Sequence, residues 1–130
     1  YSFATVTEMT GETIKTVLED VADNLFNPDP YYQQGGDMVR VGGLTYSCNP
    51  VGTAGNRISD MRLKGQLIEA GKKYKVAGWA PVAEEARHQG NKQVWEVVET
   101  WLKAQGGRIK PRQLNTPKII GALPNKGYVV

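Results

Sequence analysis

Residue types that could carry hydrolytic chemistry are scarce in this 130-residue chain. It has one histidine, His88, and one cysteine, Cys48, whereas a closed zinc site needs four such ligands. The acidic residues do not gather at ligand spacing, since Asp29 and Asp37 only flank one loop. No Gly-x-Ser-x-Gly, phosphate loop or dinucleotide fingerprint is present. The sequence therefore predicts no catalytic residue and no metal site of its own.

Residues suited to binding are concentrated between Tyr31 and Gly43. Arg40 could hold an oxyanion through two parallel N–H donors, or it could point to solvent. Tyr31 and Tyr32 could line a channel for a partner's peptide, or pack against the preceding helix. Four glycines could admit a thin peptide close to the backbone, or serve only as turn and bulge geometry: Gly35, Gly36, Gly42 and Gly43.

Several other side chains have a plainer prediction. Trp79 follows a strand pattern and could contact a substrate or sit at the edge of the core. Trp95 and Trp101 lie on or near a helical apolar stripe and are predicted to be core residues. We expect Cys48 to be a small buried hydrophobe and His88 to be a solvated loop residue.

Hydrophobic periodicity and turn residues give the elements that must position these side chains. A helix begins after Thr10–Gly11 and ends at Asn27-Pro28-Asp29-Pro30, because proline cannot continue a helix. A second helix spans 92–105, with Asn91 as its cap and Gly106–Gly107 at its end. The proline-containing tail adds a last short strand. The remaining strands are predicted at 1–9, 37–48, 57–64 and 73–79.

These elements predict an α+β fold: a mixed, mostly antiparallel sheet with two main helices, in one domain over residues 1–130. The strands from 37 to 79 are expected to form one consecutive platform. A hydrophobic content of 40% is typical of a globular chain, and a net charge of +3 is too small to indicate nucleic-acid binding. The chain starts at Tyr1 inside a strand-like run, so we expect a fragment of a longer protein.

Three contiguous motifs carry a family resemblance: GGDMVRVGGLTY (35–46), GNRISDMRLKG (55–65) and KKYKVAGW (72–79). They resemble the C-terminal domain of the 5′-nucleotidase family, and within it the SoxB-type thiosulfohydrolases of sulfur oxidation. The resemblance extends over roughly residues 1 to 105 and includes TEMTGETIKTVLEDVADNLFNPDPYYQQ (7–34). It implies the fold of that domain.

Departures from the nucleotidase pattern favour the thiosulfohydrolase branch. Nucleotidases of this family clamp the base between two aromatic rings, and Met38 stands where one of those rings is expected. Pro81 stands near the place of the other ring, and the accompanying Gly-Gly-Asp is missing. Stacking gives a base-sized slot its affinity, so we expect no useful nucleotide binding.

The resemblance implies the remaining functional expectations. The intact enzyme would be periplasmic and would release sulfate from a cysteine S-thiosulfonate on the glycine-rich arm of the SoxYZ carrier. Two manganese ions, held in a preceding metallophosphatase domain, would activate the water, and this domain would bind the substrate without a cofactor of its own. We expect no contact with nucleic acid or membrane. The predicted substrate-binding residues are Tyr31, Tyr32, Gly35, Gly36, Met38, Arg40 and Trp79.

Two alternatives stay open from the sequence. A true 5′-nucleotidase or related phosphoesterase domain would need new base contacts, for instance Tyr31, Tyr32 or Trp79. A non-catalytic binding module that works alone would need no upstream domain. The sequence preceding Tyr1 in the source gene distinguishes all three readings.

Overall fold

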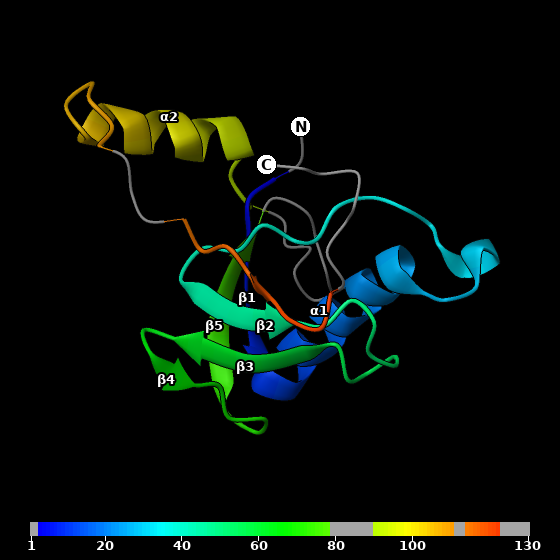
Figure 1. The fold of residues 1–130 in the computed structure, drawn as a ribbon. Helices are drawn as coiled ribbons and strands as arrows, with labels where there is room; N and C mark the ends of the chain where they lie inside the picture. Colours follow the sequence, from blue (N-terminus) through cyan, green and yellow to red (C-terminus); the bar gives the residue numbers. More distant parts are fainter. Residues whose placement is uncertain (1–2, 79–89, 111–113, 123–130) are drawn as a thin grey trace. The chain divides into compact units, whose positions relative to one another are not determined.

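The computed structural model describes residues 3–78, 90–110 and 114–122, which belong to two compact units (Figure 1). The first unit consists of Tyr1–Gly11 and Gly71–Gln113, and the second of Glu12–Ala70 and Leu114–Val130. None of the helices in these described ranges is both long and apolar enough to cross a membrane.

The first unit contains a two-stranded antiparallel sheet and one helix. Strand β1 (Thr5–Thr10) pairs with β5 (Lys73–Gly78) in a register that places Thr5 opposite Gly78. Helix α2 (Val94–Ala104) follows in the chain. Its start is tied to the segment before β1, because Ala4 N–H donates to the Lys92 carbonyl oxygen at 2.8 Å.

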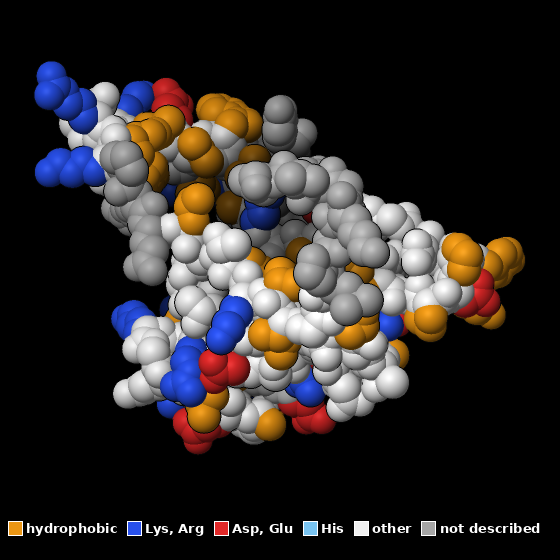
Figure 2. Space-filling view, in the orientation of Figure 1, with side chains coloured by type: hydrophobic (Ala, Val, Ile, Leu, Met, Phe, Trp, Pro, Cys, Tyr) orange, Lys and Arg blue, Asp and Glu red, His pale blue; other side chains and the backbone are white. Residues whose placement is uncertain are grey.

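Helix α2 differs from its prediction at its start and on its apolar face. Gln93, not Asn91, is the N-cap, because Glu96 completes a capping box by accepting from the Gln93 N–H at 3.1 Å. The expectation that Trp95 and Trp101 are core residues is wrong, since they are 56% and 40% exposed. Figure 2 shows hydrophobic side chains gathered over α2. The amphipathic stripe is present, but none of the residues of α2 is buried.

The second unit packs one helix on a four-stranded sheet of order β4-β3-β2-β6. Helix α1 (Gly11–Phe26) contributes all but its first residue to this unit. The β2–β6 pair is parallel and the other two pairs are antiparallel, which confirms the mixed, mostly antiparallel prediction. The strands are β2 (Leu44–Cys48), β3 (Ile58–Leu63), β4 (Gln66–Leu67) and β6 (Lys118–Ile119).

The core of this unit lies between α1 and the sheet. Leu18 and Ala22 from α1 meet Tyr46 and Cys48 from β2 and Ile58 from β3, and all five are at most 3% exposed. The spacing of Leu18 and Ala22 puts them on one helical face, as the sequence predicts. The burial of Cys48 is also confirmed. Truncating a core side chain such as Leu18 to alanine typically costs about 2–5 kcal/mol.

The predicted strand 37–48 is wrong over its first half, because β2 begins only at Leu44. Gly43 has φ +84°, a left-handed conformation that interrupts an extended strand. The expected three-strand platform is wrong as well, since β5 pairs with β1 and not with β3. The short strand predicted in the tail is present as β6.

A β-bulge in the β2–β3 pair had no clear signal in the sequence. Thr45 pairs with Arg62 and Ser47 with Ser59, so Tyr46 faces two residues of β3. One of these two, Asp60, has φ +49°. A bulge of this kind inserts an extra residue into one strand and increases the local twist.

Candidate functional site

The C-terminal end of α1 leads into a short 3₁₀ helix, η1 (Pro30–Tyr32), which presents two tyrosines. Asp29 caps η1, because its Oδ1 accepts from the Tyr31 N–H at 2.9 Å. The Asp29 N–H in turn donates to Oδ1 of Asn27 at 3.0 Å. Pro30 stands at the first helical position, where its fixed φ suits the turn. The Asn27–Pro30 segment therefore both ends α1 and builds a defined tip.

Tyr31 and Tyr32 form an exposed aromatic pair at this tip. Their ring centroids are 5.4 Å apart with an interplanar angle of 89°, an edge-to-face arrangement. The residues are 87% and 60% exposed, so packing of either tyrosine against α1 is not what the structure shows. The space-filling view has hydrophobic side chains at the place of η1 (Figure 2). Such a pair offers apolar surface and hydroxyl groups to a partner.

The chain returns from η1 to β2 through Gln33–Gly43, which contains no helix or strand (Figure 1). Gly35 and Gly36 have φ values of +75° and +102°, so a side chain there would strain the backbone. A Cβ on either glycine would meet nothing within 4 Å, so open space lies beside both. Gln33 Nε2 donates to the Asn27 carbonyl oxygen at 2.7 Å and ties the segment to the end of α1.

Met38 and Arg40 do not share a surface in the way that strand alternation predicts. Met38 is half-buried and packs against the core of the second unit. The Arg40 side chain is 92% exposed, and its Nη2 lies 3.7 Å from Oδ2 of Asp37, itself 85% exposed. The alternation argument fails because residues 37–43 are not in a strand. An ion pair this open to water contributes little stability, so the guanidinium remains available to an anion.

Three residues named from the sequence lie outside the described residues: Trp79, Pro81 and His88. The other six predicted site residues are neighbours in the sequence and belong to the second unit: Tyr31, Tyr32, Gly35, Gly36, Met38 and Arg40. Their contact with a substrate stays a prediction.

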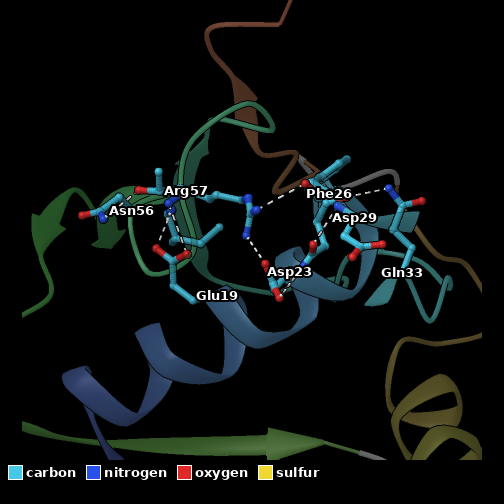
Figure 3. Close-up of polar contacts among 10 residues, drawn as sticks. Glu19, Asp23, Phe26, Asp29, Gln33, Asn56 and Arg57 are labelled. Carbon is cyan, nitrogen blue, oxygen red and sulfur yellow. Dashed lines mark hydrogen bonds and ion pairs between the residues drawn. The ribbon is translucent and has the colours of Figure 1, made fainter. Parts of the chain in front are cut away.

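A buried arginine, Arg57, anchors the end of α1 that carries this stretch (Figure 3). Its side chain is 1% exposed, and Nη1 donates to Oδ1 of Asp23 at 2.6 Å. Nη2 donates to the Phe26 carbonyl oxygen at 3.2 Å, which caps the last turn of α1. Figure 3 shows Arg57 reaching from the β2–β3 side toward α1. The sequence contained the signal, since Arg57 belongs to the GNRISDMRLKG motif, but its partners could not be inferred.

Glu19 completes the anchor from the middle of α1. Its carboxylate accepts from two successive backbone N–H groups, those of Arg57 at 3.1 Å and Ile58 at 2.8 Å. Lys15 adds a bond from Nζ to the Gly55 carbonyl oxygen at 3.1 Å. The β2–β3 loop is therefore held against α1 by both side-chain and backbone groups.

Two pKa values are shifted near this anchor, those of Asp23 and Cys48. Hydrogen bonds from Arg57 and from Asn27 hold the pKa of Asp23 below its ordinary value, because both favour the carboxylate. Burial, followed by the nearby Glu19 carboxylate, raises the pKa of the Cys48 thiol. Cys48 is therefore a poor nucleophile, since the thiolate is the reactive form.

The stretch from Tyr31 to Arg40 can bind but offers little chemistry. Its described side chains are aromatic, apolar, amide, acidic or guanidinium groups, with no histidine, cysteine or serine. Over the ranges that the structure describes, no three His, Cys, Asp or Glu side chains gather as metal ligands. The groups that are present suit recognition of a ligand through apolar contact, hydrogen bonds and charge.

Comparison with known proteins assigns a family to this architecture. The profile of the family described as 5′-nucleotidase, C-terminal domain, matches residues 3–88. The solved structure of the sulfate thiohydrolase SoxB from Thermus thermophilus, in complex with glycerol, has a TM-score of 0.78 and 31% identity over 95% of this chain. No curated protein sequence matches the chain.

A second solved structure has the same fold at lower identity. It is assigned as a 5′-nucleotidase from Staphylococcus aureus, in complex with α-ketoglutarate, with a TM-score of 0.64 and 18% identity over 90% of this chain. The chain spans 23% of the Thermus protein and 27% of the Staphylococcus protein.

Proposed function

We propose that this chain, which belongs to the 5′-nucleotidase C-terminal domain family, is the substrate-recognition domain of a SoxB-type thiosulfohydrolase. The intact enzyme hydrolytically releases sulfate from a cysteine S-thiosulfonate on the SoxYZ carrier during thiosulfate oxidation. The observation that carries this proposal is the likeness to Thermus SoxB, 31% identical over 95% of the chain. The likeness to the Staphylococcus protein is 18% identical and supports the fold alone.

Met38 supports the choice of substrate class. It stands where the resemblance to nucleotidases expects an aromatic ring, and its side chain packs against the core of the second unit. A half-buried thioether turned to the core cannot stack on a base. The surface left at this stretch includes exposed glycines, the tyrosine pair and Arg40, together with Asp37 and Val39. Such a surface suits an extended, slender peptide better than a nucleoside.

Arg40 is the proposed oxyanion ligand. Its guanidinium is held only by an exposed ion pair with Asp37, which an incoming sulfonate could replace at small cost. Two parallel N–H donors match two oxygens of such a group. Tyr31 and Tyr32 contact the carrier's arm, and Trp79 is a further proposed contact.

Catalysis belongs to a preceding metallophosphatase domain in this proposal. The two manganese ions belong to that domain in this proposal, as the family resemblance implies. Bound there, such ions supply an activated water and polarise the sulfonate oxygens. The present domain binds and orients the arm, and the protein acts in the periplasm.

Substitution of Arg40 in the full-length protein tests this role. Arg40→Ala should lower kcat/KM for the carrier-bound thiosulfonate about ten- to a hundred-fold, because a charged hydrogen bond to an oxyanion is lost. Arg40→Lys should restore only part of the rate, since lysine lacks the planar two-point donor. Trp79→Ala should also lower turnover. Arg62→Ala is the matched control, because its ion pair with Asp60 lies on β3. Equal rates for Arg40→Ala and Arg62→Ala would remove Arg40 from the site.

A further inference from the structure

The segment Gly36–Gly42 has a bare backbone. No backbone N–H or carbonyl group of these seven residues makes a hydrogen bond to another described residue. As far as the described residues go, these groups are open to water or to a partner, and backbone polar groups seek such a bond. A row of free N–H and carbonyl groups of this length is a template on which another chain can pair.

The bare segment is nevertheless held in place at both ends. The Gly35 N–H donates to the Asn24 carbonyl oxygen at 3.2 Å, and the Gly43 N–H donates to Oδ1 of Asn115 at 3.0 Å. Between these points, Met38 and Val41 pack against the core of the second unit. The segment is therefore ordered by its anchors, so a partner that pairs with it does not have to order it first.

The conformation of the segment also permits pairing. Residues 37–41 have no positive φ and lie in no helix, turn or bend, so no left-handed or helical residue prevents this part from extending when a partner strand pairs with it. Gly36 and Gly42 have no atom within 4 Å of the place of a Cβ, so another backbone can approach them closely. Val39 and Arg40, between the two packed residues, are exposed.

We propose that Gly36–Gly42 is a strand-addition site, on which an extended peptide with small side chains pairs through backbone hydrogen bonds. Strand addition takes its affinity from main-chain bonds and its selectivity from pockets for side chains. The Gly36–Gly42 segment offers main-chain groups and open space rather than pockets. The partner that fits is a segment with few or no side chains of its own, for which peptide groups are the main means of recognition.

The identity of this peptide rests on the proposed function: the peptide would be the carrier's arm. Strand addition is the mode of recognition. The arm is held by its backbone along Gly36–Gly42, and Arg40 alone binds the anionic end group.

Peptides that differ only in their backbone N–H groups test the proposal without changing the protein. The probe is a fluorescein-labelled, C-amidated heptapeptide of alternating glycine and serine, measured by fluorescence anisotropy against the full-length protein. Two further probes carry N-methyl groups, one on its odd and one on its even residues. Adjacent N–H groups of a strand point to opposite edges. We therefore expect one methylated peptide to bind at least about ten-fold more weakly and the other to bind as the parent does. Equal binding of all three peptides, or no binding of the parent, would overturn the proposal.

Proline substitutions test the same bonds from the side of the protein. In a paired strand, the N–H groups of Val39 and Arg40 would point to opposite edges, and Val39→Pro and Arg40→Pro each remove one of them. One of them should weaken binding of the unmethylated peptide about ten-fold relative to its matched control, Val39→Ala or Arg40→Ala. The other should differ little from its control. If each alanine variant weakens binding as much as its proline counterpart, side chains carry the recognition and the proposal is wrong.

The two proposals fail separately. Sulfate release from the carrier with no effect of N-methylation would overturn strand addition and leave the proposed function. Backbone-dependent binding of the heptapeptide by a protein that releases no sulfate would overturn the proposed function and leave strand addition.

Discussion

Arg57 and Asp23 form a 2.6 Å hydrogen-bonded ion pair in which the arginine side chain is 1% exposed and the aspartate side chain 34%. The pair joins the start of β3 to the last turns of α1, from which the tyrosine tip and the Gly36–Gly42 segment follow in the chain. The proposed binding surface therefore depends on a buried charge that lies outside it. Stability and recognition can be tested with separate substitutions.

Arg57→Ala should lower the free energy of unfolding by about 3 kcal/mol, because it removes one partner of a buried pair and leaves groups of α1 unsatisfied. Arg40→Ala is the matched control, since its ion pair is open to water and should contribute less than about 1 kcal/mol. Urea unfolding of both variants measures the difference. Similar midpoints for the two variants would show that the Arg57 anchor contributes little.

The Asp23 pKa makes part of this stability depend on pH. Its pKa is lowered in the folded protein, mainly by the hydrogen bond from Arg57. The unfolded chain, with an aspartate pKa of about 3.9, therefore binds the proton more readily as the pH falls. The Asp23 contribution is fully present above that value and is lost as the pH falls through the folded-state pKa. Urea midpoints between pH 6 and pH 2 should thus fall more for the wild type than for Asp23→Asn, and parallel curves would contradict this account.

Cys48 should be protected from thiol reagents in the folded protein. It is the only cysteine in the sequence, is 1% exposed, and has a pKa raised by burial. An Ellman-type disulfide reagent should react with it only as fast as the protein opens, and at once in denaturant. Cys48→Ser provides the blank. Complete modification of the native protein within the mixing time would show that the core between α1 and β2 is open.

Gly121 tests how the tail is fitted against β2. Its φ is +70°, and a Cβ there would lie 2.5 Å from Oδ1 of Asn49. Gly121→Ala should therefore destabilise the protein by about 1–3 kcal/mol through backbone strain and this clash. Gly42→Ala is the control, because no atom lies within 4 Å of its Cβ position and its φ is not positive. Thermal unfolding compares the two, and an unchanged midpoint for Gly121→Ala would place the tail elsewhere.

Turn residues and hydrophobic periodicity predict the helix ends and the buried helix face, because both depend on residues close together in the sequence. The prolines after Asn27 end α1, and the stripe that contains Leu18 and Ala22 faces the core. Pairing partners could not be inferred in this way. The 73–79 pattern gives a strand but not its neighbour, so β5 was assigned to the wrong sheet.

The errors around the candidate site have a common physical cause. Strand alternation predicts one strand over 37–48, whereas Gly43 adopts a left-handed conformation that interrupts it. The Arg57 anchor was missed because hydrogen bonds such as those of Arg57 with Asp23 and Glu19 join residues far apart in the sequence. Arg57 belongs to the GNRISDMRLKG motif, and the motif does not say what the arginine contacts.

The most direct test of the central claim is the product released by the full-length protein that carries this domain. The protein is supplied with manganese and given, in parallel, a carrier bearing a cysteine S-thiosulfonate and free AMP. Sulfate and phosphate are both measured, with calorimetry to follow AMP binding. The account predicts sulfate release from the carrier, no phosphate release, and AMP binding no tighter than millimolar, about 4 kcal/mol. Phosphate release with micromolar AMP affinity, and no sulfate, would contradict it and favour a nucleotidase.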